Sequence, residues 1–397
     1  MQFIKITLAK GKERSLIHRH PWVFSGAIAK KEQEPEEGAI VEVFSNTGEY
    51  LATGHYHSGS IAVRCFDFEH TRADRDFWIK KITAACALRF TNGVLDQATT
   101  NCFRLVHGEG DGLPGLIIDF YKGTAVLQAH TSGIYKVRDH IVAGLQAFFG
   151  DKLLAVYDKS SESLGKQQQG ETQNGFLYKK NEDHPEGCVV EENGKRFYVS
   201  WTEGQKTGFF LDQRENRALL ERYAAGRKVL NTFSYSGGFS IYALAGGAQL
   251  VHSVDSSAKA EAWALRNVKE NDTTVPHSFF CQDTFDFFKS SQEQYDLIVL
   301  DPPAFAKRLS ALKQACGGYQ RLNEVAFRKI APGGILFTFS CSQVIDRKLF
   351  RQLVFAAAST AGRKVRILHQ LTQGPDHPIN LYHPEGEYLK GLVLQVD

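Results

Sequence analysis

Alternation of apolar and polar residues marks the first 70 positions of the chain. Residues 39–45 alternate, a turn signal follows at 46–48, and residues 61–68 form a second β-rich run. Period-two alternation of this kind is typical of strands with one buried face. We therefore predict a small β-barrel or β-sandwich domain over residues 1–70.

The hydrophobic pattern changes to helical spacing after residue 71. Apolar positions three and four residues apart predict helices over 73–90 and 135–149. Shorter β-rich runs predict strands over 103–107, 115–120, 124–130 and 153–157. The polar stretch 160–185, rich in Gln, Lys and Glu, predicts a loop or linker. These elements together predict a small central α/β domain over residues 71–187.

Strand and helix patterns alternate regularly over residues 188–397. Strands are expected over 228–231, 250–254, 277–281, 297–300 and 335–339, and helices over 239–245 and 258–270. Such alternation predicts a mostly parallel sheet with helices on both faces, as in a Rossmann-like fold. Ligands of these sheets bind beyond the carboxyl ends of the strands, so functional residues are expected there.

Composition narrows the class of protein. The chain has 397 residues, of which 43% are hydrophobic and 23% charged, as in globular proteins with two or three domains. No apolar run is long enough to span a membrane, and the N-terminus lacks the pattern of a signal peptide. We expect a cytoplasmic protein. The net charge of +3 permits a nucleic-acid partner without requiring one.

The seven cysteines show neither Cys-x-x-Cys pairs nor His–Cys clusters at zinc spacing. This pattern argues against a disulfide framework and against a metal site. A functional cysteine is then expected to act as a thiol. Cys86 and Cys281 are expected in the core.

Three predicted strands end in residues that suit an adenosine-containing cofactor. The first runs into a turn with the adjacent glycines Gly237 and Gly238, which is not the Gly-x-Gly-x-x-Gly dinucleotide motif. The second ends in Asp255, a residue type that accepts hydrogen bonds from both ribose hydroxyls. The third ends near Asp283, where a short polar side chain can meet the adenine edge. Each aspartate alone is typical of a helix cap, but the three strand ends together favour a cofactor site.

The fourth predicted strand opens onto Asp301, Pro302, Pro303, Ala304 and Phe305. The prolines stiffen this loop, and the aspartate supplies an acceptor at the strand tip. The loop resembles the Asp/Asn-Pro-Pro-Tyr/Phe motif of amino-directed methyltransferases. It differs in having alanine where an aromatic ring would stack on the target base, which argues against an exocyclic amine as the target.

The next predicted strand ends at Cys341, between Ser340 and Ser342. Carbon 5 of a pyrimidine is too weakly nucleophilic to take a methyl group directly. Addition of a thiolate at carbon 6 creates an enamine-like intermediate that does so, and the thiol leaves later by elimination. The carboxylate of Asp301 would support the charge that develops on the ring. We therefore predict that Cys341 is a nucleophile and that Asp301 assists it.

Ordered motifs extend this interpretation to the whole chain. They are HPWVFSG at 20–26, a motif over 104–115, KTGFFLDQR at 206–214, GY at 318–319 with Asn323, SCS at 340–342, DHP at 376–378 and PEGEYLKG at 384–391. With these motifs the chain resembles, nearly end to end, the large-subunit ribosomal RNA cytosine-5 methyltransferase I family.

The resemblance implies an N-terminal PUA domain, a central α/β domain and a C-terminal Rossmann-like, S-adenosylmethionine-dependent methyltransferase domain. It also implies formation of 5-methylcytosine in 23S rRNA, with Cys341 as nucleophile and Asp301 near the methionine amine of the cofactor. Family members suggest a homodimer, although no residue pattern requires one. The cofactor-binding residues implied by position are Phe233, Ser234, Tyr235, Gly237, Asp255, Ser256, Asp283, Thr284, Asp301 and Asp212.

Two features bear on RNA binding. A basic stretch near the start suits phosphate contacts; it comprises Lys10, Lys12, Arg14, His18, Arg19 and His20. The segment GHYHSGSI at 54–61 lacks the proline that this family usually has there, which predicts a reshaped loop. The target base must be unpaired or flipped to reach a thiol at a strand tip, and Phe305 and Tyr319 are candidates to hold it.

Three other functions compete with this one. The first is methylation of an exocyclic amine, guanine N2 or adenine N6, which would use Asp301 to Pro303 and have no need of Cys341. The second is an RNA-binding or ribosome-assembly factor that has lost turnover, which would ignore S-adenosylmethionine. The third, a dehydrogenase, is disfavoured by the missing dinucleotide motif.

Overall fold

The computed structural model describes residues 3–91, 93–164, 172–306 and 308–397. The chain folds as two compact units, each made of several segments. The first comprises Met1–Val190, Val199–Phe209 and Pro375–Gly386, and the second comprises Glu191–Tyr198, Phe210–Gly374 and Glu387–Asp397. No helix in the described ranges is both long and apolar enough to cross a membrane. The division into three domains after residues 70 and 187 stays a prediction.

The first unit begins with a six-stranded sheet in the order β2-β6-β5-β4-β1-β3. Its strands are β1 (Ile4–Leu8), β2 (Trp22–Phe24), β3 (Ile28–Lys31), β4 (Ile40–Phe44), β5 (Tyr50–Tyr56) and β6 (Ile61–Asp67), with the short helix α1 (Arg14–Ile17). Alternating residues such as Ile6, Val41 and Val43 have no exposed surface and form the core of this sheet. The alternation predicted from the sequence is therefore that of a sheet with one buried face.

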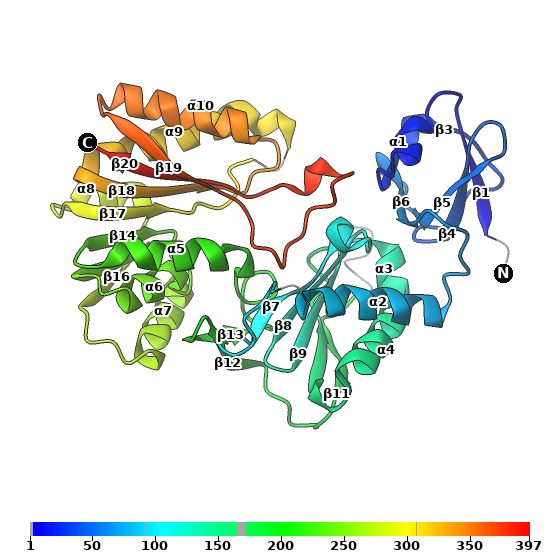
Figure 1. The fold of residues 1–397 in the computed structure, drawn as a ribbon, viewed down its shortest axis with the longest axis horizontal. Helices are drawn as coiled ribbons and strands as arrows, with labels where there is room; N and C mark the ends of the chain where they lie inside the picture. Colours follow the sequence, from blue (N-terminus) through cyan, green and yellow to red (C-terminus); the bar gives the residue numbers. More distant parts are fainter. Residues whose placement is uncertain (1–2, 92, 165–171, 307) are drawn as a thin grey trace. The chain divides into compact units, whose positions relative to one another are not determined.

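A second sheet in the same unit has five strands in the order β11-β10-β9-β8-β7. They are β7 (Cys102–His107), β8 (Leu116–Tyr121), β9 (Thr124–Ala129), β10 (Ala155–Asp158) and β11 (Gly175–Lys179), accompanied by α2 (Arg75–Arg89), α3 (Ser132–Lys136) and α4 (Arg138–Phe149). Helices α2 and α4 lie along this sheet (Figure 1). Trp78, Ile82 and Leu145 of these helices are fully buried against it.

Two predictions for this region were wrong in detail. The stretch 160–185 is not entirely loop, because β11 pairs antiparallel with β10 at the sheet edge. Its polar flanks concealed a strand that gains its hydrogen bonds only from β10. Residues 165–171 of the same stretch lie outside the described residues. The helix predicted over 135–149 is two helices that meet at Val137.

The chain next forms a two-stranded hairpin, β12 (Gly187–Glu192) and β13 (Lys195–Ser200), whose turn end belongs to the second unit. The second unit contains a seven-stranded sheet in the order β16-β15-β14-β17-β18-β20-β19. Its strands are β14 (Lys228–Thr232), β15 (Leu250–Asp255), β16 (His277–Cys281), β17 (Tyr295–Leu300), β18 (Ile330–Ser340), β19 (Val365–Leu371) and β20 (Lys390–Val396). β20 runs antiparallel to both of its neighbours, and the other pairs are parallel.

Helices cover both faces of this sheet (Figure 1). α5 (Arg214–Ala224), α6 (Gly238–Ala245) and α7 (Ala258–Glu270) lie on one face, and α9 (Leu312–Lys329) and α10 (Arg347–Thr360) lie on the other. A continuous core joins α9, α10 and α8 (Thr284–Ser290) to the central strands; it includes Phe287, Ile298, Leu322, Leu336 and Phe350. The predicted α/β class with a mostly parallel sheet is confirmed. The sequence did not reveal β19 and β20, and β18 is longer than predicted.

Candidate active site

The carboxyl ends of the central strands meet at one edge of the seven-stranded sheet. Thr232, the last residue of β14, pairs with Val254 of β15 and Leu300 of β17, and Leu300 pairs in turn with Thr338 of β18. Neighbouring strands lie about 4.8 Å apart. The residues at and just beyond the ends of these strands therefore gather at one edge, and they include Phe233, Asp255, Asp301 and Cys341.

The loop after β14 has an unusual backbone. Phe233 and Tyr235 have φ angles of 53° and 45°, and Gly237 has a φ of 80°. Non-glycine residues in this left-handed region cost roughly 1–2 kcal/mol each. A side chain at position 237 would face that cost and would bring its Cβ to 3.3 Å from the Cβ of Ala264. Backbone strain of this kind concentrates at ligand sites, so the loop is a candidate for cofactor contact.

Asp255 holds this loop to the end of β15. Its carboxylate accepts hydrogen bonds from the backbone N–H of Tyr235 at 2.9 Å and from that of Ser257 at 3.1 Å. Hydrogen bonds to a charged acceptor are stronger than neutral ones and fix the orientation of the carboxylate. Asp283 does not contact this loop in the same way. Its side chain caps α8 by accepting hydrogen bonds from the backbone N–H groups of Phe285 and Asp286.

Cys341 lies one residue beyond β18 and is partly exposed. Its thiol donates to the carbonyl oxygen of Pro302, with the sulfur 3.9 Å from that oxygen. The buried Ser342 strengthens the same junction, because its hydroxyl accepts from the backbone N–H of Ala306 and lies 3.0 Å from the hydroxyl of Tyr319. The loop after β17 and the tip of β18 thus form one hydrogen-bonded structure.

Negative charge is concentrated around the thiol. Burial and the neighbouring Asp212 carboxylate raise the pKa of Asp301 to about 7, although a hydrogen bond with Gln213 acts in the opposite direction. Burial raises the pKa of the Cys341 thiol to about 12, and Asp301 and Asp212 add to the rise. The thiol is therefore held in its neutral form in the protein alone.

Several buried polar atoms at this edge have no hydrogen-bond partner among the described residues. They include Oδ1 of Asp212 and the hydroxyl oxygens of Ser234 and Ser236. The other oxygen of Asp212 accepts from the hydroxyl of Tyr388 at 2.6 Å. Buried polar atoms are usually paired, so atoms left without a partner at a strand end indicate a ligand. A carboxylate and two hydroxyls suit a cationic, polar ligand such as S-adenosylmethionine.

Two family models match the chain. A PUA-like domain matches residues 6–68, and an S-adenosylmethionine-dependent methyltransferase matches residues 178–380. Ribosomal RNA large subunit methyltransferase I of Aeromonas salmonicida is 40% identical over 398 residues, covering 98% of this chain and 98% of that protein. The protein of the same name from Tolumonas auensis is 39% identical, with 98% of each chain covered. This chain belongs to the ribosomal RNA large subunit methyltransferase I family. The predicted S-adenosylmethionine dependence is confirmed at the level of the family.

A solved structure matches almost the entire chain of this family member. A candidate SAM-dependent methyltransferase from Streptococcus mutans superposes with a TM-score of 0.84 at 24% identity, covering 98% of this chain and 99% of that one. A candidate methyltransferase complexed with S-adenosylhomocysteine superposes with a TM-score of 0.85, also at 24% identity, over the same shares of both chains. These likenesses show the fold, and the fold class predicted from the sequence is confirmed.

The structure brings most of the predicted site residues together at the strand ends of the second unit. Phe233 to Gly237, Asp255 and Asp301 follow adjacent strands, and Asp212 is electrostatically coupled to Asp301. Ser256 is exposed beyond β15, and Thr284 is buried as the first residue of α8. The roles of these residues stay predictions.

Two subsidiary predictions were wrong. Cys281 is exposed at the end of β16 rather than buried in the core, whereas Cys86 is fully buried as predicted. Tyr319 has no exposed surface, and its ring packs 4.6 Å from that of Phe305 and 5.8 Å from that of Phe350, centroid to centroid. It therefore cannot stack on a base, and its hydroxyl forms a hydrogen bond with that of Ser342 instead.

Sequence reasoning assigned no role to Lys390 or Tyr388. Lys390 is 3% exposed at the start of β20, and its ammonium donates to the carbonyl oxygens of Ser342 and Tyr388, each at 2.7 Å. The available signal was a lysine at the head of a mostly apolar strand. Burial lowers the pKa of this lysine to about 8.

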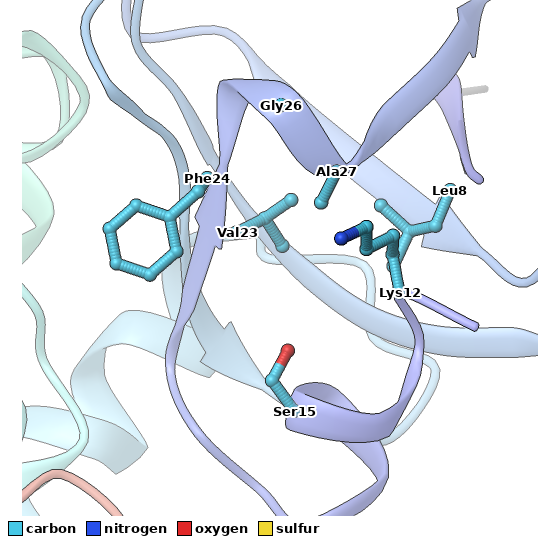
Figure 2. A pocket seen from close by; sticks show the side chains of 7 residues that line it. All are labelled: Leu8, Lys12, Ser15, Val23, Phe24, Gly26 and Ala27. Carbon is cyan, nitrogen blue, oxygen red and sulfur yellow. The ribbon is translucent and has the colours of Figure 1, made fainter. Parts of the chain in front are cut away.

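The PUA-like region contains a separate hollow of about 350 Å³ between α1 and β2. Figure 2 shows that Lys12 and Ser15 extend into it, while the ring of Phe24 points away. Lys12 belongs to the basic stretch predicted to contact phosphates. In the nearby loop of the same domain, Glu37 accepts from the backbone N–H of Ser58 at 2.9 Å and also bonds to His57. The segment that lacks the usual proline is thus held by a carboxylate.

Proposed function

We propose that this chain methylates carbon 5 of a cytosine in 23S rRNA and that Cys341 is the nucleophile. The proposal rests on one observation: the thiol stands at the tip of β18, hydrogen-bonded to the loop that carries Asp301. An exocyclic-amine methyltransferase would have no use for a thiol at this position. The names of the relatives, which specify large-subunit ribosomal RNA, support the RNA class.

The chemistry assigned to Cys341 is a reversible addition. Its thiolate forms a bond to carbon 6 of the cytosine, and the electron pair of the 5,6 double bond moves toward carbon 5 and the ring. Carbon 5 then becomes nucleophilic enough to accept a methyl group. The proton on carbon 5 then passes to solvent, the electron pair of that bond re-forms the 5,6 double bond, and the pair of the sulfur–carbon 6 bond leaves with Cys341 as its thiolate, which restores the aromatic ring.

Asp301 is proposed to support the charge that develops on the cytosine ring. With a pKa of about 7, its carboxyl group is partly protonated near neutral pH and can share a proton with the ring. Phe305, which is partly exposed in the same loop, is the remaining candidate to hold the target base.

The residues that would hold S-adenosylmethionine surround the end of β14. The strained loop Phe233 to Gly237 would line the cofactor, Asp255 with Ser256 would bind its ribose, and Asp283 with Thr284 would lie near its adenine. Asp301 and Asp212 would face its positive charges, in agreement with the buried carboxylate oxygen that has no partner among the described residues. When bound, the cofactor supplies an electrophilic methyl group.

The remaining parts of the proposal concern the partner. The PUA-like domain, with Lys12 and its basic neighbours, would dock the rRNA through phosphate contacts. We place the activity in the cytoplasm, where ribosomal RNA of bacteria is made. Family resemblance also suggests a homodimer, which light scattering on the purified protein would test.

The test compares wild-type protein with Cys341→Ala on unmodified rRNA and isotope-labelled S-adenosylmethionine. The labelled nucleosides are identified by mass spectrometry after digestion. Wild type is expected to yield labelled 5-methylcytidine, and the variant is expected to lose at least about a thousandfold in rate, because the nucleophile is absent. Cys281→Ala is the matched control, since Cys281 is exposed at another strand end.

Other products would overturn the proposal in identifiable ways. Label on guanine or adenine, undiminished in Cys341→Ala, supports exocyclic-amine methylation. Absence of any cofactor binding supports an RNA-binding factor without turnover.

A further inference from the structure

Lys390 is a buried cation at the strand edge that holds the thiol. It lies directly opposite Ser340, the last residue of β18, in the β18–β20 pair, and Cys341 is the next residue of the chain beyond that strand. Both acceptors of its ammonium, the carbonyls of Ser342 and Tyr388, are neutral. A buried ammonium without a hydrogen-bonded carboxylate is costly to maintain, which calls for a specific reason.

Cys341 is the group most closely coupled to this cation. After burial, the thiol is the first contributor to the pKa of Lys390, which it raises, and Lys390 in return lowers the pKa of the thiol. The other charged groups that face Cys341 are Asp301 at the end of β17 and Asp212 before α5, and both oppose the thiolate. Lys390 is thus the charged group that favours the thiolate of Cys341, whereas the two carboxylates around the thiol oppose it.

The remaining charges that act on Lys390 come from neighbouring loops. Glu387 and Asp346 raise its pKa, and Arg347 lowers it. Arg347 and Glu387 also form an ion pair with one another. Tyr319, behind the thiol, stays neutral because burial raises the pKa of its hydroxyl.

We propose that Lys390 is a positioning residue that stabilises the thiolate of Cys341 through its buried ammonium group. The carbonyls of Ser342 and Tyr388 fix the ammonium on the turn that carries the thiol. Only the thiol proton is transferred, and it passes to solvent. This inference rests on the proposed function, in which the thiolate of Cys341 adds to the base. A group that stabilises the thiolate would therefore assist that addition.

The test measures the reactivity of Cys341 directly, without methyl transfer. Full-length protein is treated with iodoacetamide between pH 6.5 and 9.5, and alkylation of Cys341 is followed by peptide mass spectrometry. At pH 7, Lys390→Met is expected to react about tenfold more slowly than wild type, because loss of a nearby cation raises a thiol pKa by about one unit. Lys390→Gln, which keeps hydrogen-bond donors but has no charge, is expected to match Lys390→Met.

The pH dependence separates a charge effect from a structural one. The wild-type advantage is expected to shrink above about pH 8, where Lys390 itself loses its proton. Lys329→Met is the matched control, since that lysine also donates to a backbone carbonyl, that of Ser291, away from the site. Its alkylation profile at Cys341 is expected to equal that of wild type.

Three results would overturn the inference. They are equal rates in wild type and Lys390→Met, a wild-type rate in Lys390→Gln, and a deficit that stays constant up to pH 9.5. If thermal unfolding shows that both variants are misfolded, the pH profile of the wild-type protein decides. The logarithm of its Cys341 alkylation rate must rise by less than one per pH unit near pH 8, and a constant slope of one refutes the role of Lys390. A failed methyl-transfer assay with Cys341→Ala would refute the nucleophile but would leave these alkylation results unaffected.

Discussion

The two units each bury a set of charges, but they satisfy them differently. In the first unit, Arg89 is completely buried, and its guanidinium forms a bidentate pair with Asp111 at 2.5 and 2.8 Å. Its remaining N–H groups donate to the carbonyl oxygens of Ala85, Arg104 and Asp376. In the second unit, Asp212 keeps a buried oxygen without a partner among the described residues, and Asp301 and Cys341 lie in a field that opposes their charged forms.

This difference distinguishes a structural use of charge from a functional one. All the N–H groups of the Arg89 guanidinium donate to acceptors of the same unit. The Arg89–Asp111 pair therefore stabilises the fold and has no donor left for a ligand. The strand-end set of the second unit leaves charge and hydrogen-bonding capacity without partners among the described residues, which is typical of a ligand site. Buried polar groups should therefore be judged by what remains unpaired rather than by how many there are.

The largest effect is expected from breaking the paired set. Arg89→Met would leave the Asp111 carboxylate, whose side chain is 1% exposed, buried without its cation. We expect the free energy of unfolding to fall by about 3–5 kcal/mol, measured by urea titration. The double variant Arg89→Met with Asp111→Asn should recover part of this loss. A fall of less than about 1 kcal/mol in the single variant would contradict a structural role for the pair.

A smaller effect, on binding rather than on folding, is expected at the unpaired carboxylate. Asp212→Asn keeps the shape of the side chain and an acceptor for Tyr388 but removes the charge that we propose faces the cofactor. Affinity for S-adenosylmethionine should fall about 10- to 100-fold, which corresponds to roughly 1.4–2.8 kcal/mol, with little change in stability. Isothermal titration calorimetry measures the affinity. Asp286→Asn, on the exposed side of α8, is the control, and equal affinities in both variants would exclude Asp212 from the site.

The smallest effect concerns the stability cost of Asp301. Its pKa of about 7 lies above the ordinary value of 3.8, so the folded state holds a proton that the unfolded state releases between these pH values. Folding stability therefore falls as pH rises from about 4 to 7. Asp301→Asn should be more stable than wild type at pH 8 by on the order of 1 kcal/mol. The figure is kept low because Asp301 is only half-buried, so that solvent screens its carboxylate. At pH 4 the two should unfold at the same temperature, and an equal difference at both pH values would contradict the assignment.

The sequence by itself determined the fold class, the cofactor class and the strand-end positions. Period-two and helical spacing are local properties. Asp255 ends its strand, and Asp301 and Cys341 directly follow theirs, so the pattern was enough to locate them. It could not find β11 or β20, because an edge strand with polar flanks, or one that returns antiparallel from far along the chain, has no local signature.

Only the tertiary structure decided which charges are paired. Lys390 is 49 positions beyond Cys341 in the chain, and the β18–β20 register brings it beside the thiol. The same holds for Asp212, which meets Tyr388 across a long stretch of sequence, and for Tyr319, which packing removes from any contact with a base. Residue types and spacing specify what a side chain can do. Burial and neighbours set its charge, because desolvation and Coulomb interactions depend on distances that exist only in the folded chain.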